Sequence, residues 1–203
     1  MTVQRGFTLI ELAIAIAIIT LLLAAVFKGG SMIEQARVQD TLAIASDLSA
    51  SARSFKQRYH YLPGDLAINS AVPEIPEVPV GCMSGGTGAG DGNGVLSLAE
   101  STCVPAHLFA AGYTKGGSGE IRSPYGSVRV IANAFSNVAI GPNPLPATVL
   151  NVIEFSNLPC AVALEMDRKL DDGNLATGRA RASVAICQPE VSNDPVPFFA
   201  LVL

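Results

Sequence analysis

An apolar run near the N-terminus limits what this chain can fold into. From Phe7 to Phe27 the sequence reads FTLIELAIAIAIITLLLAAVF, which is 21 residues with a single charged side chain, Glu11. As a helix with a rise of about 1.5 Å per residue, this run would extend about 30 Å, the hydrocarbon thickness of a bilayer. Lys28 closes the run. The sequence therefore predicts one membrane-spanning segment, and no later segment is apolar enough to span a membrane.

Glu11 is out of place in a simple membrane anchor. A carboxylate at the centre of a membrane helix costs on the order of 2.5–3.5 kcal/mol, and less near the helix end, so it indicates a functional site. A secretory signal peptide would have a shorter apolar core and a small-residue cleavage site, for which Ala24 and Ala25 are poor candidates. A plain anchor fits the length of the run but leaves the acid unexplained.

The residues around this acid point to a third interpretation. The sequence Arg5-Gly6-Phe7-Thr8-Leu9-Ile10-Glu11 closely resembles the processing signal of type IV pilins and type II secretion pseudopilins. The resemblance implies cleavage after Gly6 by a prepilin peptidase and N-methylation of the new N-terminus, Phe7. Glu11 then becomes the fifth residue of the mature chain, where this family carries its acid. The implied organisation is a leader at 1–6, a transmembrane or filament-core helix at 7–28 and a periplasmic head at 29–203.

The resemblance also implies a role for Glu11. A buried carboxylate needs a partner or becomes protonated. The free α-amino group at Phe7 of a neighbouring subunit would supply a positive charge at the same depth, and this pairing would set the axial register between subunits. The alternative is that Glu11 extends from the helix end to the lipid headgroups.

Beyond Lys28, apolar residues recur every three or four positions, which predicts an amphipathic helix continuing the membrane helix. Pro63 and Gly64 predict its end near Tyr61–Asp65. The glycines at 29 and 30 predict a bend or local melting, because each destabilises a helix by about 1 kcal/mol. The apolar stripe consists of Val38, Leu42, Ala45, Leu48, Ala52, Phe55 and Tyr59.

The second half of the chain changes to a period of two. Strands are predicted at Ser127–Asn133, Thr148–Phe155 and Arg179–Cys187, and helices at Pro105–Ala111 and from Asn157 to about Leu170. The predicted fold class is α+β and pilin-like. A long N-terminal helix, half in the membrane and half amphipathic, packs on a small antiparallel sheet of three or four strands with long loops. The phrases YLPGD, GDGNG and MDRKLDDGNLATG additionally resemble one subgroup of prepilin-type proteins.

Four cysteines follow the membrane segment: Cys82, Cys103, Cys160 and Cys187. An even number in an exported head favours two disulfides, and four cysteines permit three connectivities. We favour Cys82–Cys103 and Cys160–Cys187, because pairs that are close in sequence would cross-link the two irregular regions. A C-terminal disulfide loop is also common in type IV pilins. The alternative is that some of these cysteines are buried thiols.

Calcium is the one candidate ligand. Asp91 and Asn93 alternate with glycines, as oxygen ligands do in tight cation loops, and some pseudopilins bind calcium in their heads. An EF-hand loop beginning at Asp91 would, however, have Thr102 in place of its bidentate glutamate. Asp167, Asp171 and Asp172 form a second acidic turn. We favour ordinary turn chemistry for both regions. The two histidines, His60 and His107, are predicted at the surface or at helix ends.

Composition narrows the function classes. Hydrophobic residues make up 49% and charged residues 15% of the chain, which excludes intrinsic disorder. Lys+Arg 13 against Asp+Glu 17 gives a net charge of -4 and argues against a nucleic-acid partner. The sequence contains none of the G-x-S-x-G, P-loop and H-E-x-x-H motifs, so no enzymatic activity and no cofactor apart from candidate calcium are predicted.

The resemblance implies a structural subunit of a type IV pilus or a type II secretion pseudopilus. Its partners would be other pilin or pseudopilin subunits, the prepilin peptidase/methyltransferase, an inner-membrane assembly platform and, before assembly, membrane lipid. The chain would cross the inner membrane once, with its head in the periplasm, and then enter a filament. The alternative is a membrane-anchored periplasmic binding module or enzyme with no filament role. The sequence leaves open whether the subunit is a major pilin, a minor pilin or a pseudopilin.

Overall fold

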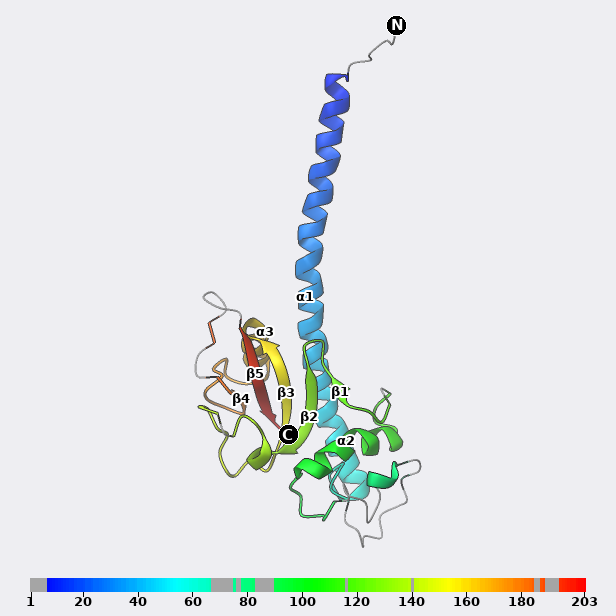
Figure 1. The fold of residues 1–203 in the computed structure, drawn as a ribbon, viewed down its shortest axis with the longest axis vertical. Coiled ribbons are helices and arrows are strands. Elements are labelled where there is room, and N and C mark those ends of the chain that lie inside the picture. Colours follow the sequence, from blue (N-terminus) through cyan, green and yellow to red (C-terminus); the bar gives the residue numbers. More distant parts are fainter. Residues whose placement is uncertain are drawn as a thin grey trace. The chain divides into compact units, whose positions relative to one another are not determined.

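A computed structural model describes residues 7–66, 75, 78–82, 90–115, 117–139, 141–184, 187–188 and 194–203. The chain forms two compact units, Met1–Gln39 and Asp40–Leu203. The second unit contains both helical and strand elements, and these are connected by irregular segments (Figure 1). The domain boundaries predicted after residues 6 and 28 stay predictions.

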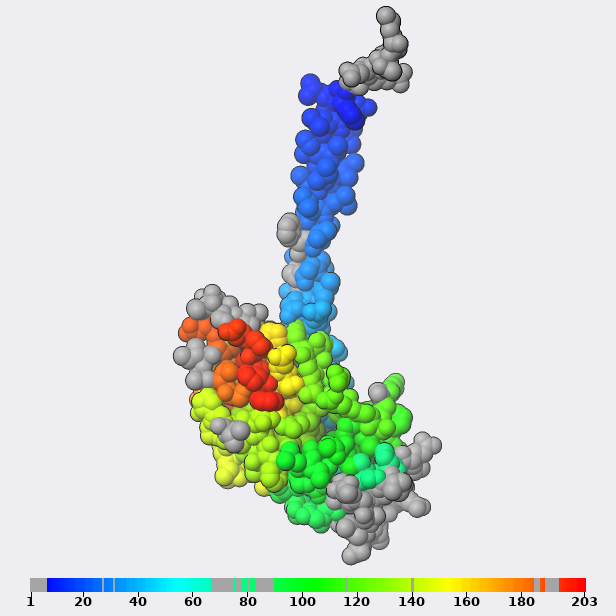
Figure 2. Space-filling view, viewed as in Figure 1, coloured from blue at the N-terminus to red at the C-terminus, as the bar shows by residue number. Residues whose placement is uncertain are grey.

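One helix, α1 (Leu9–Tyr59), runs through the first unit and into the second. In the first unit its apolar side chains are exposed: Leu9 is 87% accessible and Val26 72%. This stretch is long and apolar enough to cross a membrane by length and composition. Figure 2 shows one face of it in blue.

The predicted melting at Gly29 and Gly30 is wrong, because both residues are helical within α1. A glycine costs a helix about 1 kcal/mol. Helix formation is cooperative, so two such positions inside a helix of 51 residues do not stop propagation from either side.

The predicted apolar stripe forms the buried face of α1 in the second unit. Leu48, Ala52, Phe55 and Tyr59 are all buried, and the exposed positions lie between them. Phe55 is fully buried, with its ring centroid 4.5 Å from that of Tyr59. The helix ends close to the predicted position, before the turn formed by Pro63 and Gly64.

Five strands form a single antiparallel sheet in the order β1-β2-β3-β5-β4 (Figure 1). They are β1 (Ile121–Arg122), β2 (Ser127–Ala132), β3 (Asn151–Pro159), β4 (Ala180–Ala182) and β5 (Pro195–Val202). The central strand β3 pairs with β2 and β5, and its first five residues are buried. The α+β class with a long N-terminal helix and a small antiparallel sheet is confirmed.

The sheet has one or two strands more than predicted. The additional strands are β1 and β5, and β5 contains Pro195 and Pro197, residues that a sheet interior disfavours. In the structure β4 pairs only with Phe199–Leu201 of β5, so it does not need the N–H groups that the two prolines lack. The strand predicted at Arg179–Cys187 is limited, among its described residues, to Ala180–Ala182.

Two further helices begin at other positions than predicted. Helix α2 (Leu98–Ala110) starts seven residues before Pro105, because Ser97 and Glu100 form a capping box at its N-terminus. Helix α3 (Cys160–Leu170) starts after Pro159, because β3 continues pairing with β5 as far as that residue. Short 3-10 turns lie at Val80–Cys82 and Asn133–Phe135.

Replacing Phe55 tests the packing of α1 in the second unit. Phe55→Ala should lower the free energy of unfolding by about 3–5 kcal/mol, because a fully buried ring is removed between Tyr59, His107 and Tyr113. The chain has no tryptophan, so near-UV circular dichroism of tyrosine can follow unfolding of the chain in detergent. The exposed neighbour Lys56→Ala is the control and should change stability little. Equal effects of the two variants would contradict this packing.

Candidate functional site

The N-terminal end of α1 contains a pair of reciprocal hydrogen bonds. The Glu11 backbone N–H donates to Thr8 Oγ1 over 3.3 Å, and the Thr8 backbone N–H donates to Glu11 Oε2 over 2.9 Å. The Thr8 hydroxyl also donates to Oε2 over 2.8 Å. This is a capping box, in which an N-cap threonine and the glutamate three residues later satisfy each other's N–H groups. The T-x-x-E spacing was available in the sequence but was not used to locate the helix start.

Glu11 therefore has a local partner before any neighbouring chain is considered. Its carboxylate is exposed, and the hydrogen bonds from the Thr8 N–H and hydroxyl both end on Oε2. Phe7, the predicted N-terminus after cleavage, is 89% accessible. Gly6, the other half of the predicted cleavage site, lies outside the described residues. The roles assigned to Gly6, Phe7 and Glu11 stay predictions.

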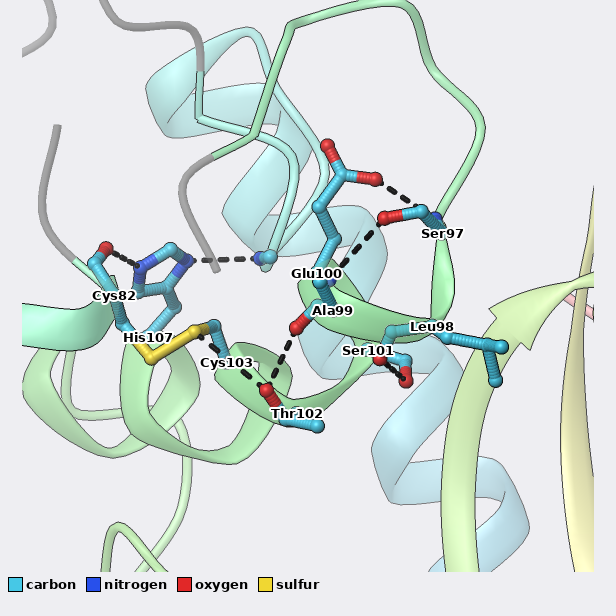
Figure 3. Close-up of a disulfide and its surroundings, with 10 residues drawn as sticks. Cys82, Ser97, Leu98, Ala99, Glu100, Ser101, Thr102, Cys103 and His107 are labelled. Atoms are coloured by element: carbon cyan, nitrogen blue, oxygen red, sulfur yellow. Dashed lines mark hydrogen bonds between the residues drawn. A yellow bond between two sulfur atoms is a disulfide. The ribbon is translucent and has the colours of Figure 1, made fainter. Parts of the chain in front are cut away.

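In the second unit, one disulfide joins Cys82 to Cys103 of α2 (Figure 3). A second joins Cys160, the first residue of α3, to Cys187. These are the two pairs that the sequence favoured, and among the described residues no cysteine is free. The disulfides connect regular helices to irregular segments, which is the place where a small core needs cross-links.

His107 lies beside the first disulfide in the last turn of α2, which is one of the two predicted positions, but it is completely buried and not at the surface. The Gly64 N–H donates to Nδ1 over 2.8 Å, and Nε2 lies 2.9 Å from the Cys82 carbonyl oxygen (Figure 3). Since Nδ1 accepts, the proton is on Nε2, which donates to Cys82. Burial lowers the pKa of His107 below its usual value, and the bond to Cys82 opposes this shift. The ring's partners lie 43 and 25 residues away in sequence, so no local pattern could reveal its burial.

The phrases YLPGD and GDGNG, which resembled a prepilin subgroup, pack against each other. Asp65 is 1% exposed, and its two carboxylate oxygens accept the backbone N–H groups of Gly92 and Gly94, each over 2.7 Å. Burial raises the pKa of Asp65, and these two hydrogen bonds act in the opposite direction. A Cβ at Gly90 would collide with the Asp65 backbone, so this approach requires glycine.

The residues of the calcium prediction lie in the same turn. Asp91 accepts from the N–H and side-chain amide of Asn93, and Asn93 Oδ1 accepts from the Val95 N–H. Asp91, Asp65 and Glu100 place carboxylate oxygens within 4.8 Å of one another. Glu100 itself accepts backbone N–H groups through both oxygens, from Asp91 and from Ser97. Hydrogen bonds thus account for this cluster, and calcium binding by Asp91 and Asn93 stays a prediction.

The structure thus has two parts. One is an exposed apolar helix whose first turn is capped by Thr8 and Glu11. The other is an α+β unit that contains two disulfides. This combination fits a pilin-type subunit that is anchored in a membrane by its N-terminal helix. Residues 1–27 match the family model described as the prokaryotic N-terminal methylation motif. The match confirms the prepilin-type resemblance for the N-terminal segment and ends before the second unit. No curated protein and no solved structure matches the chain significantly.

The buried imidazole predicts a pH dependence of stability. The pKa of His107 is lower in the folded than in the unfolded protein, so the unfolded protein binds more protons between the two values. The contribution of neutral His107 is therefore complete above about pH 6.5 and is lost as the pH falls below it. His107→Gln, which retains one acceptor and one donor, should remove this dependence.

The measurement is the urea unfolding free energy of the two proteins between pH 8 and pH 5. The difference between wild type and His107→Gln isolates the histidine from other titrating groups. Wild type should lose its advantage progressively below about pH 6.5. A pH-independent difference would contradict the neutral, doubly bonded imidazole.

Proposed function

We propose that this protein is a structural subunit of a type IV pilus or of a type II secretion pseudopilus. A prepilin peptidase cleaves it after Gly6 and the same class of enzyme methylates Phe7. The mature chain is held in the inner membrane by α1 with its second unit in the periplasm, and an assembly platform moves it into a filament. The observation that carries this proposal is the exposed apolar start of α1, Leu9 to Val26, which lies within the residues that match the methylation motif.

The free energy of assembly depends on what covers the apolar surface of α1. Its apolar side chains are exposed from Leu9 onwards, so the helix needs a bilayer or other apolar helices around it. Transfer from lipid to a filament core brings little hydrophobic gain, because both environments are apolar. Packing between helices and polar contacts must therefore favour the filament, and Glu11 is the single charged residue between Phe7 and Phe27.

Glu11 is positioned to accept a cation from a second copy of the chain. Its carboxylate is at the start of α1, at the same end of the helix as Phe7. An α-amino group at Phe7 of a neighbouring subunit would neutralise the carboxylate where water is absent, and ion pairing is strong in such surroundings. Thr8 holds the carboxylate in place before the partner arrives.

The alternative is a periplasmic binding module or enzyme on a simple membrane anchor. Such a protein needs neither cleavage after Gly6 nor an acid inside the apolar run. The methylation motif and Glu11 therefore favour the filament subunit, whereas the second unit by itself favours neither. The choice between major pilin, minor pilin and pseudopilin rests on the genes and filaments of the host.

The first test is the N-terminal sequence of the mature protein. Purification from host membranes followed by intact-mass and peptide mass spectrometry should show a chain that begins at Phe7 with one added methyl group. A matched sample from a strain without the prepilin peptidase should retain Met1. A chain in wild-type cells that begins at Met1, or near Ala25, would contradict processing as a prepilin.

The second test separates the charge of Glu11 from its capping role. Glutamine at the same position retains the capping box, whereas alanine removes both functions. If the charge pairs with a neighbouring amine, Glu11→Gln and Glu11→Ala should both reduce incorporation into sheared filaments by at least about ten-fold, since an unpaired buried charge costs several kcal/mol. Insertion and cleavage of both variants should be normal.

Glu34→Gln is the matched control, because Glu34 lies on the same helix and forms an exposed ion pair with Arg37. It should assemble normally, since exposed pairs contribute at most about 1 kcal/mol. Normal assembly of Glu11→Gln together with failure of Glu11→Ala would show that capping, and not the charge, is required.

A further inference from the structure

A second acidic cluster lies where α3 ends. Asp167 is in the last turns of the helix, and Asp171 and Asp172 follow it immediately. Each of the three offers one carboxylate oxygen, and these atoms all lie within 4.8 Å of one another. Asp167 is buried, Asp171 is partly buried and Asp172 is exposed, so the cluster extends from the interior to the surface.

Asp167 distinguishes this cluster from an ordinary acidic turn. It is completely buried, and neither carboxylate oxygen has a hydrogen-bond partner. Against the effect of burial, the backbone N–H groups of Gly173 and Asn174 lower the pKa of Asp167, but neither lies within hydrogen-bonding geometry of its carboxylate. A buried carboxylate without a donor is costly and calls for another source of positive charge.

The surrounding chain holds the other two aspartates in fixed positions. Asp171 Oδ2 accepts the Ala180 N–H over 2.9 Å and also the Arg179 N–H. Gly178 has a φ of 72°, and a Cβ there would collide with the Asp171 carboxylate. Asp172 accepts the Asn174 N–H over 2.9 Å and the Thr177 hydroxyl over 2.7 Å. The loop from α3 to β4 is therefore built around these carboxylates.

Two neighbouring basic side chains have other partners. Arg181 donates to the carbonyl oxygens of Gly178 and Pro144. The hydrogen bond from Thr177 and, to a smaller extent, the charge of Arg181 lower the pKa of Asp172. Lys169 pairs with Glu165 over 3.2 Å. Among the described residues none of the ion pairs includes Asp167. Burial, together with the negative charges of Asp172 and Asp171, raises the pKa of Asp167 to about 6.

The cluster around Asp65 provides the contrast. It also contains three carboxylates, but both oxygens of each of its two buried members, Asp65 and Glu100, accept backbone N–H groups. Only the cluster at the end of α3 combines three convergent carboxylates with a buried carboxylate that has no donor, within the described part of the chain.

We propose that Asp167, Asp171 and Asp172 bind a hard divalent cation of the calcium class. Carboxylate oxygens are the ligands that calcium prefers, and its variable coordination accepts water on the exposed side of such a site. The cation would supply the charge that Asp167 lacks and would tie the end of α3 to the loop preceding β4. The site is independent of the filament role, because it lies wholly within the second unit.

The test is calcium-dependent stabilisation of the full-length chain in detergent. After removal of metals with a chelator, CaCl2 at about 100 times the dissociation constant should raise the melting temperature by roughly 5 °C or more. Isothermal titration calorimetry should show one site, and a dissociation constant of about 10⁻⁴–10⁻³ M would be typical of extracellular calcium modules. MgCl2 in parallel shows whether the site selects the larger ion.

Asp167→Asn removes one charge without changing the shape of the side chain. It should abolish the calcium response and should not lower the melting temperature without metal, because an unpaired buried charge is removed. Asp91→Asn, in the other acidic cluster, is the matched control and should respond to calcium like wild type. The proposal is overturned if wild type shows no calcium response, or if Asp167→Asn responds like wild type.

Discussion

The apolar side chains of α1 between Leu9 and Val26 are exposed, and the chain needs surroundings that cover this surface. Water does not tolerate an apolar surface of this extent, so the helix requires a bilayer or other helices around it. Both environments also require internally satisfied backbone groups, which a helix provides. The capping box adds side-chain acceptors for the backbone N–H groups of Thr8 and Glu11 at the start of the helix.

The second unit depends on contacts between segments that are far apart in sequence. Phe55 of α1 stacks near His107 of α2, and His107 in turn bonds to Gly64 and to Cys82. The disulfide from Cys82 to Cys103 joins the same region covalently. A unit with many irregular segments has few helix and strand bonds to hold them, so buried polar groups and cross-links replace part of a larger core.

Local patterns in the sequence predicted the elements whose signal is periodic. The stripe from Leu48 to Tyr59 predicted the buried face of α1, and alternation predicted β2. Strand β5 was not predicted: its two prolines disfavour a strand locally, whereas its pairing with β3 is a long-range property. The start of α2 was misplaced because Pro105 received more weight than the capping residues at 97 and 100. His107 lies near the end of a helix, as predicted, but its burial was not predicted because it depends on partners distant in sequence.

Three carboxylates at the candidate sites also show that local sequence does not reveal the contacts of a side chain. Sequence identifies Glu11, Asp65 and Asp167 equally well as acids, but their chemistry depends on the donors that the fold brings to them. Asp65 receives two backbone N–H groups from a glycine turn and needs nothing else. Glu11 receives its bonds from Thr8 on an exposed helix end, and the proposed pairing with a second chain would use the same carboxylate. Asp167 is buried without a donor, so its charge needs a proton or a cation. The free-energy cost of an unpaired buried charge thus separates an acid that stabilises the fold from acids that require a partner.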